Sequence, residues 1–195
     1  MERLGVLASG GGSNLAAILR AGLPVVVVVV DRECGAVTVA EDAGVPARVV
    51  ERGPDRVEFT HRVVDALEGH GVEVVAMAGF MTILDKPIFD AFAGRVLNTH
   101  PSLLPAFRGA HAVPDALEAG VKVTGCTIHV ATLEVDSGPI LAQEAVPVLP
   151  DDTVDRLHEW IKAVEHRLYP ETIRRFLAGS VPERGAGSVP ERRDP

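Results

Sequence analysis

The sequence of 195 residues has little cysteine, no long hydrophobic run and an excess of acidic over basic residues. Its two cysteines, Cys34 and Cys126, lie far apart without metal-ligand spacing, so we expect buried, reduced thiols rather than a disulfide or zinc scaffold. The longest apolar run, residues 23–30, is too short to cross a bilayer, and the first one ends at Ala8, too early for a signal peptide. The formal net charge of −8 argues against a broad basic surface. We therefore expect a cytoplasmic protein that binds neither nucleic acid nor membrane.

The 47% of hydrophobic residues suffices for one domain with a full core. Strand-like segments alternate with helical ones, which predicts an α/β fold: Rossmann-like, with a mostly parallel central sheet flanked by helices. We expect strands over residues 3–8, 24–30, 47–50, 72–78, 95–99, 122–130 and 140–146. We expect helices over residues 13–20, 55–68, 86–92, 113–118 and from a cap at Thr153 to about 177. The uniformly apolar strand 24–30 is expected to be central, and the last two strands to form an antiparallel pair before the long C-terminal helix.

The character of the chain changes after residue 178. The hexapeptide Gly-Ser-Val-Pro-Glu-Arg occurs at residues 179–184 and again at 187–192. Such a polar segment has too little apolar surface to fold alone. We expect one domain over residues 1–178 and a flexible C-terminal tail over residues 179–195.

A glycine-rich segment, Ser-Gly-Gly-Gly-Ser-Asn at residues 9–14, connects the first strand to the first helix. The N–H groups and dipole at a helix N-terminus bind anions without lysine, so a monophosphate site is predicted. A tight turn in which Ser13 or Asn14 caps the helix is the alternative. A dinucleotide site matches in part, because Asp31 stands where a ribose-binding acid would lie, but Leu15 occupies the position that needs a small residue.

Residues 98–105, Asn-Thr-His-Pro-Ser-Leu-Leu-Pro, carry the most specific pattern. Alternate residues of a strand share one face, so Asn98 and His100 should project together, with Pro101 keeping His100 at the strand end. Asp136, in a later glycine-containing loop, could return to the same edge of the sheet. A carboxylate beside an imidazole favours acid/base work, and an amide can donate to a developing oxyanion. These three side chains predict acyl transfer by direct attack of one substrate on another.

Other interpretations of these residues have weaker support. Ser102 lacks the Gly-x-Ser-x-Gly context of a hydrolase nucleophile. A metal site from His100, His111 and His129 follows no zinc spacing, so no metal is expected. Individually, Asn98 could cap a strand and His100 could be a hydrogen-bonded core residue.

Four segments together resemble the phosphoribosylglycinamide formyltransferase family of purine synthesis. They are residues 9–14, residues 78–81 (Ala-Gly-Phe-Met), residues 98–105, and residues 136–140 (Asp-Ser-Gly-Pro-Ile). The resemblance extends from about residue 3 to about residue 177. It implies formyl transfer from 10-formyltetrahydrofolate, as cosubstrate, to the amine of glycinamide ribonucleotide, through a tetrahedral intermediate and without metal.

The resemblance also implies a role for particular positions. The catalytic residues correspond to Asn98, His100 and Asp136. Glu165 would contact the ribonucleotide, and Lys162 on the same helical face would assist its phosphate. The phosphate loop corresponds to Gly12, Ser13 and Asn14. The folate contacts correspond to Arg56, Asn98, Met81, Thr82, Ile83, Leu84, Thr132, Leu133, Glu134 and Val135.

One segment departs from the pattern. The segment Phe107-Arg108-Gly109 resembles the corresponding loop of methionyl-tRNA formyltransferase. The acidic net charge and the single-domain length of this chain do not resemble that enzyme. Another formyltransferase that uses 10-formyltetrahydrofolate, a nicotinamide-dependent oxidoreductase and a non-catalytic binding module are the alternatives. The sequence leaves open whether the protein is a monomer or a homodimer.

Overall fold

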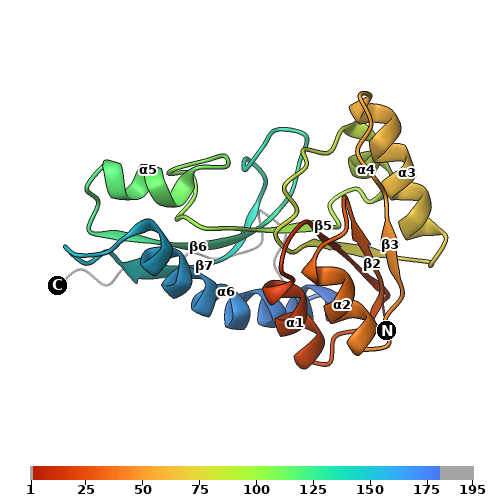
Figure 1. The fold of residues 1–195 in the computed structure, drawn as a ribbon, viewed down its shortest axis with the longest axis horizontal. Coiled ribbons are helices and arrows are strands. Elements are labelled where there is room, and N and C mark those ends of the chain that lie inside the picture. The colour runs from red at the N-terminus through yellow and green to blue at the C-terminus, as the bar shows by residue number, and fades with distance from the viewer. Residues whose placement is uncertain (1, 181–195) are drawn as a thin grey trace.

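The computed structural model describes residues 2–180 and has a seven-stranded sheet in the order β3-β2-β1-β4-β5-β6-β7 (Figure 1). The pairs among β1 to β5 are parallel, whereas β5 with β6 and β6 with β7 are antiparallel. The strands are β1 Leu4–Ala8, β2 Val25–Val30, β3 Ala47–Val49, β4 Val74–Met77, β5 Val96–His100, β6 Val123–Val130 and β7 Ile140–Pro147. The helices are α1 Ser13–Arg20, α2 Gly35–Asp42, α3 Arg56–Glu68, α4 Lys86–Ala91, α5 Ala112–Glu118 and α6 Val154–Leu177.

This architecture confirms the predicted fold class, including the antiparallel C-terminal pair and the long last helix. The strand β2 is interior, as expected, and pairs with β1 and β3. Two features add to the prediction: helix α2, which was not expected, and the antiparallel pairing of β5 with β6. The predicted domain boundary at residue 178 stays a prediction, and the tail beyond residue 180 lies outside the described residues.

Two apolar layers cover the two faces of the sheet. Helices α1, α2 and α6 pack on one face, and α3 and α4 pack on the other (Figure 1). Helix α3 turns Phe59 and Val63 into the core, whereas Val57 and His61 are exposed. Tyr169 fixes α6 beneath the sheet, because its hydroxyl donates to the carbonyl of Leu97 at 2.9 Å. Because β1, β4 and β5 pair in parallel, their carboxyl ends lie at one edge of the sheet.

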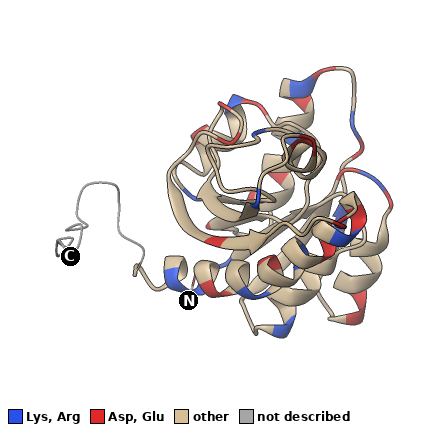
Figure 2. Ribbon diagram, turned by 90° about the vertical axis from the view of Figure 1, so that its left-hand side faces the viewer, with Lys and Arg blue, Asp and Glu red and all other residues tan. Residues whose placement is uncertain are grey.

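The distribution of charged residues and the burial of the two cysteines agree only in part with the predictions from sequence. Figure 2 shows Lys and Arg interspersed with Asp and Glu along the helices. Cys126 is fully buried, and burial raises the pKa of its thiol to about 12, whereas Cys34 is only half-buried, contrary to the prediction. In the described part of the chain, no helix is long and apolar enough to cross a membrane.

Candidate active site

A cavity of about 570 Å³ lies at the carboxyl edge of the parallel strands. Its wall combines the glycine loop at 10–14, the segment 77–84 after β4, the end of β5, and the loop 131–136 after β6. Four residues of α6 complete it: Val154, His158, Lys162 and Glu165. A volume of this size is typical of sites that enclose small molecules.

The glycine loop enters α1 through Gly12, whose φ of 78° lies in the left-handed region. A Cβ at Gly12 would also lie 2.9 Å from the Cα of Ala36, so only glycine fits this tight passage. No side chain caps the helix, which makes the capping role suggested for Ser13 or Asn14 wrong. The free N–H groups at the start of α1 therefore remain available to an anion.

Glu165 joins three elements beneath the glycine loop. Its Oε2 accepts a hydrogen bond from Nδ2 of Asn14 at 3.1 Å, and its Oε1 accepts one from the Thr99 hydroxyl at 2.9 Å. The Oδ1 of Asn14 is buried and has no hydrogen-bond partner among the described residues. It is therefore an acceptor available to a ligand hydroxyl or amine.

Helix α6 brings two basic side chains to the same cavity. Lys162 was predicted from the sequence as a phosphate-binding residue. Its Nζ lies 2.8 Å from Oε1 of Glu159. His158, one helical turn earlier, also lines the cavity and was missed. The spacing of His158, Lys162 and Glu165 along α6 was the signal that could have found it.

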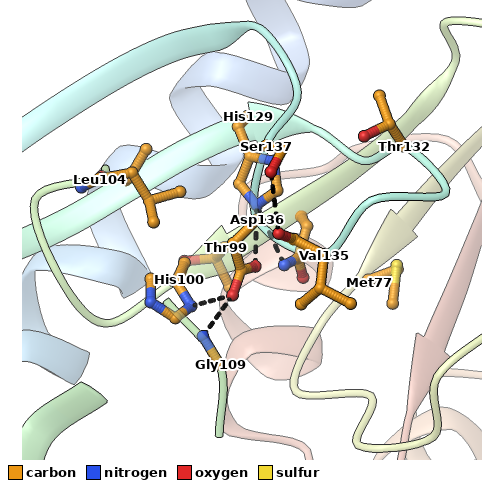
Figure 3. Close-up of polar contacts among 12 residues, drawn as sticks. Met77, Thr99, His100, Leu104, Gly109, His129, Thr132, Val135, Asp136 and Ser137 are labelled. Carbon is orange, nitrogen blue, oxygen red and sulfur yellow. Dashed lines mark hydrogen bonds and ion pairs between the residues drawn. The ribbon is translucent and has the colours of Figure 1, made fainter. Parts of the chain in front are cut away.

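The structure brings together the three residues predicted at the reaction centre. Asn98 and His100 border the cavity from β5, while Thr99 between them points to α6. Oδ2 of Asp136 lies 3.4 Å from Nδ1 of His100 and accepts a hydrogen bond from the Gly109 N–H at 2.8 Å (Figure 3). Asp136 reaches this position with a φ of 53°, unusual for a residue other than glycine.

Several opposing effects set the ionisation of Asp136. Burial raises the pKa of its carboxyl, but a hydrogen bond from the side chain of His129 lowers it. The Gly109 N–H and the charge of His100 lower it further, and the net pKa is below the ordinary value. The carboxylate is thus ionised at neutral pH although it is 9% exposed.

The second ring nitrogen of His100 is also engaged. Its Nε2 donates to the carbonyl oxygen of Phe107 at 2.7 Å, so this nitrogen carries a proton. Phe107 has a φ of 52° and belongs to the Phe-Arg-Gly segment that departs from the family pattern. This segment therefore forms hydrogen bonds with both His100 and Asp136: the Phe107 carbonyl bonds to His100, and the Gly109 N–H bonds to Asp136.

The sequence suggested His129 only as a member of a rejected metal site, and its place beside Asn98 was not predicted. The antiparallel pairing of β5 and β6 places His129 directly opposite Asn98. The Nε2 atom of His129 lies 3.2 Å from the Nδ2 atom of Asn98. The same Nε2 lies 3.6 Å from Oδ1 of Asp136. The three-histidine metal set is not assembled, because His111 is exposed at the start of α5, and within residues 2–180 no cluster of His, Cys, Asp and Glu is arranged to hold a metal ion.

The residues expected to contact folate form one apolar wall, with two exceptions. Met81, Ile83, Leu133 and Val135 line the cavity and are 45–62% exposed, and Leu84, Thr82 and Thr132 accompany them. Glu134 is adjacent in sequence but does not line the cavity.

Arg56 is the second exception. Its Nε donates to Oδ2 of Asp85 at 2.7 Å, next to Leu84 but outside the cavity wall. The Lys86 N–H, followed by the Arg56 guanidinium, lowers the pKa of Asp85. Arg56 is therefore placed to reach only a part of a ligand that extends beyond the cavity.

Asp31 does not serve as a ribose-binding acid. Its buried carboxylate is held by Nε of Arg52 at 2.9 Å, by Arg32 at 3.0 Å and by the Thr82 hydroxyl at 2.5 Å. Leu15 is fully buried behind the glycine loop. The carboxylate on which the dinucleotide alternative depends is thus already bonded within the protein.

Comparison with known proteins decides the family. The family model described as formyl transferase matches residues 2–173. The phosphoribosylglycinamide formyltransferase of Mycobacterium tuberculosis (strain ATCC 25618 / H37Rv) is 49% identical over 173 residues, covering 85% of this chain and 80% of that protein. The chain belongs to the phosphoribosylglycinamide formyltransferase family.

Further relatives of the formyltransferase family agree in sequence and fold. Glycinamide ribonucleotide transformylase 1 from Symbiobacterium toebii superimposes with a TM-score of 0.91 at 47% identity, covering 95% of this chain and 92% of its own. The trifunctional purine biosynthetic protein adenosine-3 of Gallus gallus is 42% identical over 96% of this chain. The chain spans only 20% of that larger protein.

Proposed function

We propose that this chain transfers the formyl group of 10-formyltetrahydrofolate to the amine of glycinamide ribonucleotide, in purine biosynthesis. The single observation that carries the proposal is one continuous cavity that joins a phosphate-sized helix N-terminus to the Asn98, His100 and Asp136 cluster and to an apolar wall. A phosphorylated amine and a flat, largely apolar formyl donor can meet at that cluster. Family membership supports the same reaction.

The ribonucleotide is assigned to the glycine loop. The N–H groups of Gly12, Ser13 and Asn14 bind the phosphate, and Lys162 supplies positive charge. Glu165 accepts hydrogen bonds from the ribose hydroxyls, in line with its position beneath the loop. The substrate amine then points along the cavity toward β5.

The formyl donor is assigned to the apolar wall. The exposed side chains of Met81, Ile83, Leu133 and Val135 match a flat ring system, and their burial by a ligand is favourable. Thr82, Leu84, Thr132 and Glu134 belong to the same two loops. Arg56, outside the wall, is placed to pair with the carboxylates at the far end of a folate.

In the reaction, the substrate amine attacks the formyl carbon and forms the new C–N bond. The carbonyl oxygen becomes negative and accepts a hydrogen bond from Nδ2 of Asn98, and a second one from Nε2 of His100 once that N–H has left the carbonyl oxygen of Phe107. Collapse of this tetrahedral intermediate breaks the bond to N10 of the folate, and the proton lost by the amine is delivered to N10. Asp136 stabilises the positive charge of the His100 ring when that ring holds a second proton.

The decisive experiment incubates the purified chain with both substrates and follows formylglycinamide ribonucleotide by mass spectrometry. We expect product only when both substrates are present, and at least about a hundredfold lower turnover for His100→Ala. Formate release without the ribonucleotide would indicate a water-accepting relative instead. Absence of formylated product would reject the proposed function, and near-normal turnover of His100→Ala would remove His100 from the mechanism.

A further inference from the structure

Asp31 is a buried carboxylate to which the proposed reaction gives no role. Its side chain is 0% exposed, and it directly follows β2 at the carboxyl edge of the sheet. Its Oδ2 accepts hydrogen bonds from the Thr82 hydroxyl at 2.5 Å and from Nη2 of Arg32 at 3.0 Å, and forms an ion pair with Nε of Arg52 at 2.9 Å. A buried carboxylate without such partners would be costly. These contacts explain how the fold tolerates Asp31, but not what it is for.

The contact with Thr82 joins two segments that the sheet itself does not join. Strand β1 lies between β2 and β4, and Thr82 belongs to the segment that follows β4. Of the three donors to Asp31, only Thr82 lines the cavity. Asp31 therefore connects the end of β2 to the apolar wall that is assigned to the formyl donor.

The segment after β4 has further anchors on either side of Thr82. The Gly79 carbonyl accepts from the Ser9 N–H at 3.1 Å, and the Met81 N–H donates to Oγ of Ser9 at 2.9 Å. The Leu84 side chain is 4% exposed and holds the far end of the segment in the core. Between these two ends, the Thr82 hydroxyl ties the segment to Asp31.

The side chains on either side of Thr82 need such an anchor. Met81 is 62% exposed and Ile83 is 54% exposed, and both line the cavity. Apolar side chains gain free energy by leaving water, so a loose segment would turn them inward when no ligand is bound. A segment that is already held in its ligand-binding conformation binds more tightly, because it loses less freedom on binding.

We propose that Asp31 is a positioning residue that holds the Thr82 hydroxyl and thereby keeps Met81 and Ile83 turned toward the formyl donor. This inference rests on the proposed function. Asp31 does not line the cavity, so its loss should weaken the binding of the folate and leave the ribonucleotide and the chemical step little changed. A chain that is merely less stable would lose active molecules, which lowers the apparent kcat and changes neither KM.

Two substitutions remove the hydrogen bond from opposite sides. Asp31→Ala removes the acceptor, and Thr82→Val removes the donor at almost the same side-chain size. We expect each to raise the KM for 10-formyltetrahydrofolate about tenfold, with kcat and the KM for the ribonucleotide within about threefold of the unaltered chain. The double variant should be no more impaired than either single one, because the same bond is lost in all three. Additive effects would show that the two side chains act separately, and would overturn the proposal.

Conservative variants test whether the hydrogen bond itself is responsible. Thr82→Ser keeps the donor and Asp31→Asn keeps an acceptor, so both should retain a KM for the folate within about threefold of the unaltered chain. Asp90→Ala is the control, because this aspartate is 60% exposed and pairs with Lys86 outside the cavity. An Asp31→Asn variant as impaired as Asp31→Ala would overturn the proposed hydrogen bond.

Binding of tetrahydrofolate, the folate product, gives a measurement that does not require turnover. By isothermal titration calorimetry, we expect the Kd of Thr82→Val to be about tenfold higher than that of the unaltered chain. Equal Kd values would overturn the proposal, even if Asp31→Ala does not fold. An unaltered chain that neither binds tetrahydrofolate nor makes formylated product would instead reject the proposed function, so the two failures are distinguishable.

Discussion

Nδ1 of His100 lies 3.4 Å from Oδ2 of Asp136, and the two side chains are only 5% and 7% exposed. A buried imidazole that gains charge during turnover needs an opposite charge close by, because water is not there to stabilise it. The Gly109 N–H at 2.8 Å fixes the carboxylate in place. The pair is thus arranged before substrate arrives.

Replacing Asp136 with asparagine should remove the charge and keep the shape. The amide oxygen can still accept from the Gly109 N–H, so the loop should stay in position. We expect kcat to fall at least about a hundredfold while the KM for the ribonucleotide changes little. Steady-state kinetics check this, with Asp151→Asn as the control, because Asp151 is an exposed partner of Arg156. Turnover of Asp136→Asn equal to that of the control would exclude an electrostatic role.

Gly138 offers a test of the loop that carries Asp136. A Cβ at this glycine would lie 1.8 Å from the carbonyl oxygen of Val130, so Gly138→Ala must displace the loop or strand β6. We expect a loss of about 1–3 kcal/mol in the free energy of unfolding, together with reduced turnover. Gly53→Ala is the matched control, because its Cβ would meet only the Arg62 side chain at 3.5 Å. Urea titration and kinetics of the two variants should differ clearly, and similar values would contradict the crowding argument.

Much of this fold could be predicted from local pattern, because strands and helices alternate with clear turn residues between them. Helix α2 could not, since it begins at Gly35 without a side-chain cap and buries only Ala36 and Ala40. Its first turn is fixed from elsewhere in the fold, by the Ala36 N–H donating to the carbonyl of Gly10 at 3.0 Å. A one-dimensional pattern does not contain that contact.

The active site, too, could be predicted from local sequence pattern only in part. Asn98 and His100 are neighbours on one strand, so their common face follows from the period of two. His129 joins them only because β6 pairs antiparallel with β5, and no local signal in residues 123–130 specifies the partner strand. Residues that act through a sheet neighbour need the register, which only the folded chain provides.

Lys162 should matter for the ribonucleotide and not for the folate. It lines the cavity near the glycine loop, and Glu159 holds its Nζ at 2.8 Å. We expect Lys162→Met to raise the KM for the ribonucleotide about tenfold, since a charged hydrogen bond to phosphate is lost, with the KM for the folate unchanged. Lys86→Met on α4, whose lysine pairs with Asp90 away from the cavity, is the control. An equal rise in both KM values would place Lys162 outside the phosphate site.

His166 predicts how stability depends on pH. Burial lowers the pKa of its imidazole below the ordinary 6.5, and its buried Nε2 has no hydrogen-bond partner in the described chain. The charge of Glu165 opposes this shift, and those of Arg20 and Lys162 reinforce it. Because the unfolded chain binds this proton more readily than the folded one, stability should fall as the pH decreases below 6.5.

A glutamine at position 166 removes this titration while keeping a polar side chain of similar length. We therefore expect the His166→Gln variant to lose less stability than the unaltered chain between about pH 7.5 and about pH 5.5. The comparison uses urea unfolding midpoints of both proteins at the two pH values, and the other histidines cancel because both proteins contain them. An identical pH dependence in the two proteins would show that the folded chain protonates His166 as easily as the unfolded chain does, contrary to its buried and unpartnered position on α6.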